Sequence, residues 1–196
     1  MKFSSHEVRD LLIAWIAISV AFAILFTGAD KLLSSLFLTA FVISLLTAGI
    51  GFLLHELAHK IVAQKYGLRA EFRAFYGMLA LAVMLSFLGF IFAAPGAVFL
   101  HGMITRERNG KISVAGPITN IVLAIIFLLP TLFFSFNSEM INLFFQYGFQ
   151  INALLALFNM IPVMPLDGAK VLAWSKPVFY ITVAIALALF IGSYFI

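Results

Sequence analysis

Two histidines and a glutamate within one apolar stretch carry the clearest chemical signal in the sequence. His55, Glu56 and His59 form a His-Glu-x-x-His pattern. Residues four positions apart share one face of an α-helix, so both imidazoles can bind the same metal ion while the glutamate lies beside it as a general base. The pattern is typical of a zinc hydrolase, although so short a motif also arises by chance on soluble helices.

The composition places this motif in a membrane protein. Of the 196 residues, 64% are hydrophobic and 10% are charged, and the mean hydropathy is +1.13. Soluble globular domains carry about 25% charged residues, so the chain is predicted to be an all-α polytopic membrane protein with the lipid bilayer as its partner. Ionisable side chains at membrane depth are costly and usually mark functional sites, which favours a metal site at His55 and His59.

Apolar runs predict about five transmembrane helices, since roughly 20 apolar residues cross a bilayer. The first run could instead end in a signal-peptide cleavage site at Ala21-Phe22-Ala23, but it stays apolar through Phe26, so an uncleaved span is favoured. We expect one membrane-embedded domain over residues 1–196, with its core at 36–171 between flanking helices. The predicted spans are 11–27, 36–63, 115–135, 143–159 and 177–196.

Two smaller features are predicted between the second and third spans. Residues 77–92 form a further apolar segment that either re-enters the membrane and returns or crosses as a sixth span. Residues 96–114 are predicted to form a small membrane-associated β-hairpin, because two short runs, 98–100 and 111–114, flank a polar turn. Pro117 is suited to the first turn of the next helix.

A third ligand has to come from elsewhere in the chain, because a catalytic zinc ion usually has three protein ligands and one open position. With no cysteine, the chain offers only histidine and carboxylate. Asp167 stands out because Pro162, Pro165 and Gly168 give it non-helical backbone, which is tolerated at membrane depth only inside protein or beside a water-filled cavity. Taken alone, however, Asp167-Gly168 is better explained as an ordinary surface turn, so the topology has to decide. His101 is the second candidate ligand, against a simpler role as a polar residue at a strand end.

The distribution of basic residues tests the topology independently, because Lys and Arg concentrate on the cytoplasmic side of membrane proteins. If the N-terminus is inside and 77–92 does not cross, eleven of the twelve basic residues lie inside; a single crossing would move five of them outside and leave six. A single crossing would also separate Asp167 from His55 and His59. The metal site is therefore predicted near the cytoplasmic face of the cell membrane. The eleven inside residues are Lys2, Arg9, Lys60, Lys65, Arg69, Arg73, Arg106, Arg108, Lys111, Lys170 and Lys176.

Three motifs occur in order between about Ala48 and Val171. They are His55-Glu56-Leu57-Ala58-His59, a Gly-Pro-x-x-Asn helix start at Gly116-Pro117-Ile118-Thr119-Asn120, and an Asn-x-x-Pro…Asp-Gly pair from Asn159 to Gly168. Together they resemble the site-2 protease family of intramembrane zinc metalloproteases (peptidase family M50). The sequence departs from the family pattern at 77–92, which separates the histidine helix from the expected hairpin and bears on how a substrate reaches the site.

The resemblance implies a protease that hydrolyses peptide bonds within or near transmembrane segments of membrane-protein substrates. It implies that His55, His59 and Asp167 bind one zinc ion, that Glu56 is the general base and that Asn159 lies at the active site. No nucleic acid is expected as a partner. Two other functions stay open: a multi-pass metal transporter, whose ligands should follow a path over several helices, and a catalytically silent receptor on the same fold, against which the intact Glu56 argues.

The charge distribution yields a direct test. Because the chain has no cysteine, Arg106→Cys introduces a single thiol on the basic side of the predicted topology. A membrane-impermeant maleimide should label this thiol in inside-out vesicles and leave it unlabelled in intact cells. Labelling in intact cells would contradict the even number of crossings between the histidines and Asp167.

Overall fold

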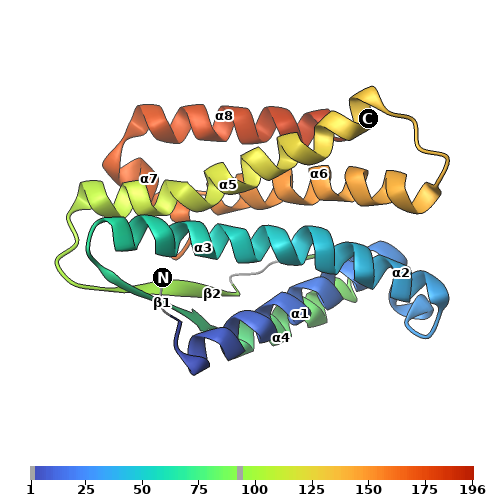
Figure 1. Cartoon of the computed structure of the whole chain (residues 1–196), viewed down its shortest axis with the longest axis horizontal. Coiled ribbons are helices and arrows are strands. Elements are labelled where there is room, and N and C mark those ends of the chain that lie inside the picture. The colour runs from blue at the N-terminus through green and yellow to red at the C-terminus, as the bar shows by residue number, and fades with distance from the viewer. Residues whose placement is uncertain (1–2, 92–94) are drawn as a thin grey trace.

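The computed structural model describes residues 3–91 and 95–196. Long helices form a bundle, and one small sheet packs against it (Figure 1). In chain order the elements are α1 (Ser5–Thr27), η1 (Ala29–Lys31), α2 (Ser35–Ser44), η2 (Leu45–Gly49), α3 (Ile50–Lys65), β1 (Arg69–Ala74), α4 (Tyr76–Ser86), β2 (Gly96–His101), α5 (Arg106–Phe133), α6 (Glu139–Asn159), α7 (Asp167–Trp174) and α8 (Lys176–Gly192).

Helix α3 lies in the middle of this arrangement. Helices α5 and α6 lie on one side of it, with α7 and α8 packed beyond them. Helix α1, helix α4 and the sheet cover the other side (Figure 1). The helix that carries the His-Glu-x-x-His motif is therefore enclosed from both sides.

Four helical stretches of the described chain are long and apolar enough to cross a membrane, and they confirm the helical character of four predicted spans. They are Ser5–Thr27, Ser35–Lys65, Arg106–Phe133 and Glu139–Asn159. The last predicted span, 177–196, corresponds to α8, whose 17 residues are slightly fewer than the roughly 20 that a bilayer requires. Polar residues extend some helices beyond their apolar runs: Ser4 caps α1 by accepting a hydrogen bond from the Glu7 amide at 3.1 Å.

A π-helical turn, η2, interrupts the second of these stretches just before the motif helix. The Leu45 carbonyl in this turn accepts a hydrogen bond from Nε1 of Trp15 at 3.0 Å. A side chain at Gly49 would overlap the Trp15 ring. An extra residue in one helical turn rotates every side chain that follows, and such turns are frequent beside functional sites. Trp15 of α1 therefore contacts the π-helical turn that determines the orientation of α3.

The predicted hairpin at 96–114 is wrong, because β2 pairs with a different partner. It lies antiparallel to β1, with Ala74 opposite Gly96 and Arg69 opposite His101. Residues 111–114 belong to α5 instead. The Thr105 hydroxyl accepts a hydrogen bond from the Arg108 amide at 3.2 Å, so the polar stretch interpreted as a turn is the cap of a helix.

The position of Pro117 also differs from the prediction. It lies in the interior of α5 rather than in the first turn, since the helix already begins at Arg106. A proline there deprives the carbonyl four residues earlier of its helical partner. Helices that cross membranes tolerate this where neighbouring helices pack against them, and Pro117 is fully buried.

The segment between the two strands leaves the sheet and returns to it. Because Ala74 and Gly96 are paired, the chain between them begins and ends at the same place and cannot cross a membrane once. Helix α4 has 11 residues and measures about 16 Å at 1.5 Å per residue, half the thickness of a bilayer core. This geometry agrees with the re-entrant alternative for 77–92, whose last residue, Phe92, lies outside the described chain.

Carboxylates of α1 close the outer edge of β1. Glu7 accepts a hydrogen bond from the Phe72 amide at 3.0 Å and forms a buried ion pair with Lys60 of α3, Nζ to Oε1 2.6 Å. Asp10 accepts hydrogen bonds from the Ala74 amide at 3.1 Å and from the Tyr76 hydroxyl at 2.6 Å. These contacts fasten the sheet to both helices, and they occupy the edge of β1 that does not face β2.

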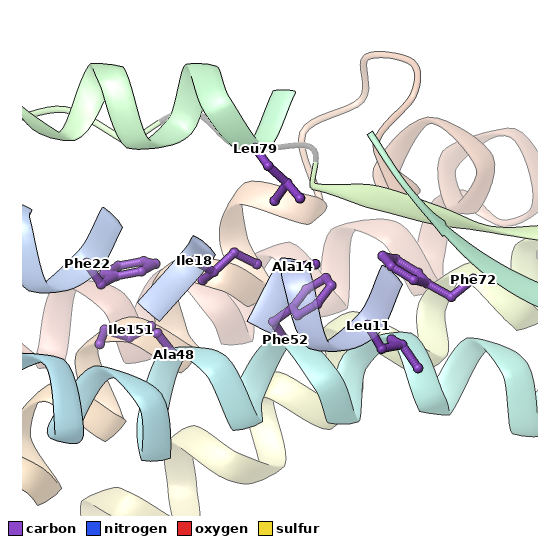
Figure 2. Packing of buried hydrophobic residues seen from close by; sticks show 9 residues of the cluster. All are labelled: Leu11, Ala14, Ile18, Phe22, Ala48, Phe52, Phe72, Leu79 and Ile151. Carbon is purple, nitrogen blue, oxygen red and sulfur yellow. The ribbon is translucent and has the colours of Figure 1, made fainter. Parts of the chain in front are cut away.

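Apolar side chains complete the junction of α1 with its neighbours (Figure 2). Leu11, Ala14, Ile18 and Phe22 recur along one face of α1 at helical spacing. Figure 2 shows this face meeting residues of η2, α3, β1, α4 and α6. The side chains that it contacts are Ala48, Phe52, Phe72, Leu79 and Ile151.

Candidate metal centre

The fold brings His55, His59 and Asp167 together, although more than a hundred residues separate the histidines from the aspartate. Their ligand atoms all lie within 4.8 Å of one another. Nε2 of His55 is 3.2 Å from Oδ2 of Asp167, and Nε2 of His59 is 3.0 Å from the same oxygen. The exposed fractions of the three residues are 4%, 7% and 7%. Two imidazoles and a carboxylate thus converge at one buried point.

This donor set fits a zinc ion. With bonds of about 2.05 Å in tetrahedral geometry, two ligand atoms lie about 3.3 Å apart, and both histidine–aspartate distances are close to this value. Two histidines and one carboxylate are a known ligand set for catalytic zinc and leave the fourth position for water or substrate. The predicted ligands are therefore brought into contact, whereas His101 is exposed at the end of β2 and is not part of this cluster.

Asp167 begins helix α7, directly after the turns that follow Asn159. Its second oxygen, Oδ1, lies 3.4 Å from Nζ of Lys170 one turn later. An aspartate binds a metal ion as the carboxylate. Lys170 was not predicted as part of the site.

Each histidine has a partner for its other ring nitrogen. Nδ1 of His59 lies 2.8 Å from the carbonyl oxygen of Ile112, and Nδ1 of His55 lies 2.6 Å from Oδ1 of Asn120. Both partners are oxygens, so each Nδ1 carries the proton and each Nε2 keeps its lone pair for a metal. Asn120 belongs to the Gly-Pro-x-x-Asn motif, but its contact with His55 was not predicted.

Glu56 lines a cavity of about 230 Å³, and His55, His59 and Asp167 line the same cavity. Its Oε2 is buried and has no hydrogen-bond partner within the described part of the chain. A buried carboxylate oxygen is normally paired, so an unpaired one beside a metal centre is placed to act on water or substrate. Strand β2 lines the same cavity through Gly96, Ala97, Val98 and Leu100.

Asn159 lines this cavity as well, as expected for an active-site residue. Its Nδ2 donates one hydrogen bond, to the carbonyl of Leu155 one turn earlier at 3.0 Å. A side-chain amide has a second N–H and a carbonyl oxygen, so Asn159 retains polar groups for a ligand. Its role at the active site stays a prediction.

Gly116 of α5 lets the two histidine rings approach that helix. A Cβ atom at this position would lie 2.6 Å from Cε1 of His59 and would overlap Nε2 of His55. No side chain larger than hydrogen fits between the backbone of α5 and the metal ligands. The glycine of the Gly-Pro-x-x-Asn motif therefore lets both histidine rings lie against α5.

Gly116→Ala should consequently weaken metal binding by moving both imidazoles. Displacing a metal ligand through its supporting contacts typically lowers affinity by about 10- to 100-fold. The measurement is the zinc dissociation constant of purified protein in competition with a chelator. Gly77→Ala is the matched control, since a Cβ atom there meets nothing within 4 Å; equal affinity of the two variants would contradict the close approach.

Three known proteins are similar to this chain. "Putative zinc metalloprotease MJ0611" of Methanocaldococcus jannaschii is 43% identical over 178 residues, which cover 89% of this chain and 87% of that protein. "Putative zinc metalloprotease YwhC" of Bacillus subtilis is 32% identical over 146 residues, 65% of this chain and 66% of that protein. "Zinc metalloprotease MJ0392" of Methanocaldococcus jannaschii is 28% identical over 153 residues, 78% of this chain and 39% of that protein.

No protein-family model matches the chain, and no solved structure matches it. The similarity to MJ0611 extends over nearly the whole of both proteins, and the buried His-His-Asp cluster supplies ligands for the metal that all three names contain. The chain belongs to the family of zinc metalloproteases represented by MJ0611, and zinc is its metal.

Proposed function

We propose that this zinc metalloprotease is an intramembrane endopeptidase of the site-2 protease type. It hydrolyses peptide bonds within or near transmembrane segments of membrane-protein substrates. One observation carries the proposal: the buried metal centre is built between helical stretches that are themselves long and apolar enough to cross a membrane. A protease acting on soluble peptides would have no need to enclose its metal between such helices.

The chain's own residues divide the chemistry among them. His55, His59 and Asp167 hold the zinc ion, which acidifies water and polarises a carbonyl group when bound. Glu56 accepts the proton of the attacking water and later transfers it to the nitrogen of the leaving amine. Glu56 lines the cavity in which the substrate would lie, and its Oε2 is buried without a hydrogen-bond partner in the described chain. Asn159 donates its free N–H to the oxygen of the scissile carbonyl or to the substrate backbone.

The free edge of β2 offers a place for the substrate backbone. On β1 the outward amides of Phe72 and Ala74 are already bonded to Glu7 and Asp10. Antiparallel pairs alternate between hydrogen-bonded and non-hydrogen-bonded, so Val98, opposite Phe72, also directs its amide outward. No further strand pairs with β2 in the described chain. An unwound substrate segment adding to this edge would lie beside the cavity.

The protein is proposed to lie in the cell membrane as a multi-pass protein, with the metal centre nearer the cytoplasmic face. The distribution of basic residues supports this orientation. The return of the chain between β1 and β2 supports the same topology, because it removes the odd crossing that the charge distribution argues against. The labelling of a cysteine at Arg106 tests the orientation.

A metal transporter is the weaker alternative. Transport sites are expected along a path through several helices. Among the described residues, however, the cluster of histidine and carboxylate with metal-binding spacing is His55, His59 and Asp167. The cluster lies beside Glu56, whose Oε2 has no hydrogen-bond partner in the described chain. This arrangement favours hydrolysis over transport of the metal ion.

Glu56→Gln should abolish cleavage while zinc stays bound. The amide keeps the size of the carboxylate but cannot accept the proton of the attacking water, and loss of a general base lowers rates by about 100- to 10,000-fold. The measurement is cleavage of a purified helical transmembrane substrate in proteoliposomes, with zinc content determined on the same samples. Zinc-dependent cleavage that survives the substitution would refute the role of Glu56, and zinc flux into the vesicles would favour transport.

Val98→Pro should reduce cleavage by removing one outward amide from the free edge of β2. The pairing with β1 is expected to persist, because the amide of a non-hydrogen-bonded position does not take part in it. Val98→Ala is the control, since it removes the side chain and retains the amide. If the proline variant binds zinc, remains folded and cleaves a transmembrane substrate as fast as the alanine variant, strand addition at β2 is wrong.

A further inference from the structure

We propose that Asn152 and Asn120 form a hydrogen-bond relay that fixes the tautomer of His55 and so presents its Nε2 to the metal. Both are positioning residues, because neither is among the proposed metal ligands. The inference rests on the proposed function only in taking His55 as a zinc ligand. Asn152 belongs to none of the three sequence motifs and lies in the middle of α6.

The relay runs across three helices that lie side by side, α6, α5 and α3 (Figure 1). Nδ2 of Asn152 donates to the carbonyl oxygen of Gly148 at 2.9 Å. Nδ2 of Asn120 donates to Oδ1 of Asn152 at 3.0 Å and to the carbonyl oxygen of Gly51 at 3.2 Å. Oδ1 of Asn120 then meets Nδ1 of His55 at 2.6 Å. Asn120 and Asn152 are both fully buried, with exposed fractions of 0%.

Each member of this chain determines the orientation of the next. A backbone carbonyl can only accept, so the carbonyl of Gly148 requires the NH₂ group of Asn152 to face it. Asn152 must then direct its oxygen toward Asn120. The NH₂ group of Asn120 faces that oxygen and the Gly51 carbonyl, which leaves only its own oxygen for His55. Nδ1 of His55 is therefore obliged to be the donor.

The consequence appears on the other side of the imidazole ring. In a neutral imidazole one nitrogen carries the proton and the other keeps a lone pair. With the proton on Nδ1, the lone pair is on Nε2, which lies 3.2 Å from the Asp167 carboxylate at the metal centre. Rotating either asparagine amide by half a turn would place like groups against each other without water to relieve them.

His55 needs such a relay, whereas His59 does not. Nδ1 of His59 meets the Ile112 carbonyl directly, and a backbone carbonyl cannot exchange its acceptor for a donor. The partner of His55 is a side-chain amide that could present either end. Only the contacts beyond Asn120 decide which end His55 meets.

Gly51 makes room for the relay on α3. A Cβ atom there would overlap Oδ1 of Asn152, and the carbonyl of the same glycine accepts a hydrogen bond from Asn120. Gly51 lies one helical turn before His55. The absence of a side chain at position 51 therefore lets the two amides meet beside His55, which they orient.

The test compares the single variants Asn152→Leu and Asn120→Leu with the double variant. The control is Asn142→Leu, at an exposed position of α6, the helix that also carries Asn152. Asn152→Leu and Asn120→Leu should each weaken zinc binding by about 10- to 100-fold, whereas Asn142→Leu should not. Because Asn152 acts through Asn120, the double variant should bind zinc no more weakly than Asn120→Leu. Affinity is measured by chelator competition on detergent-purified protein.

A spectroscopic readout separates orientation from general damage. The protein has four histidines, so ¹⁵N-histidine labelling gives a simple NMR spectrum. The signal that is lost in His55→Ala is assigned to His55. In zinc-free protein carrying Asp167→Ala, which removes the carboxylate beside Nε2, His55 should show a proton on Nδ1 alone; adding Asn152→Leu should give both tautomers. Asn152→Asp retains an acceptor for Asn120 and should restore the single tautomer, which gives a second variant if the leucine variant does not fold.

The relay is overturned if folded Asn152→Leu keeps the wild-type zinc affinity and tautomer, or if the effects of the two asparagines add. Failure of the metal assignment would look different: His55→Ala would bind zinc as tightly as the wild type. Failure of the proposed protease function would be separate again, since the relay variants would behave as expected while the wild type, with zinc bound, cleaved no transmembrane substrate.

Discussion

Burial away from water obliges the polar groups around His55 and His59 to find partners inside the protein, and much of the structure follows from this constraint. An unpaired buried donor or acceptor is costly. The two Nδ1 atoms meet Asn120 and the Ile112 carbonyl, so both rings are tied to α5. On the opposite side Lys60, the residue after His59, is paired with Glu7 of α1. The motif helix is thereby held by polar contacts on both sides as well as by apolar packing.

Among the polar groups that lack a partner are those to which the proposed function assigns a role in hydrolysis or substrate binding. Oε2 of Glu56 is buried without a partner, and β2 has an edge to which no other strand of the described chain is added. Glu56 and residues of β2 line the same cavity. By contrast, the equivalent edge of β1 is closed by Glu7 and Asp10. The protein thus satisfies one edge of its sheet internally and leaves the other beside the metal centre.

Small residues decide how closely the helices approach this centre. A side chain at Gly116 would collide with both histidine rings, and one at Gly51 would collide with Asn152. Interfaces between membrane helices are generally rich in small residues because these let backbones come close. Here the close approach has a specific result: it brings the backbone of α5 against the proposed metal ligands His55 and His59 and lets α6 reach His55 through two amides.

The sequence by itself determined the helical spans, because runs of apolar residues are a local signal, and it determined the histidine pair, because four-residue spacing places both on one helix face. It also indicated Asp167, through charge distribution and the order of motifs. Only the tertiary structure decided that β2 pairs with β1 across α4 rather than with residues 111–114, and that Asn152 faces Asn120. Strand pairing across a long insertion and contacts between polar residues of different helices depend on how the elements pack, and no local pattern in the sequence records that packing.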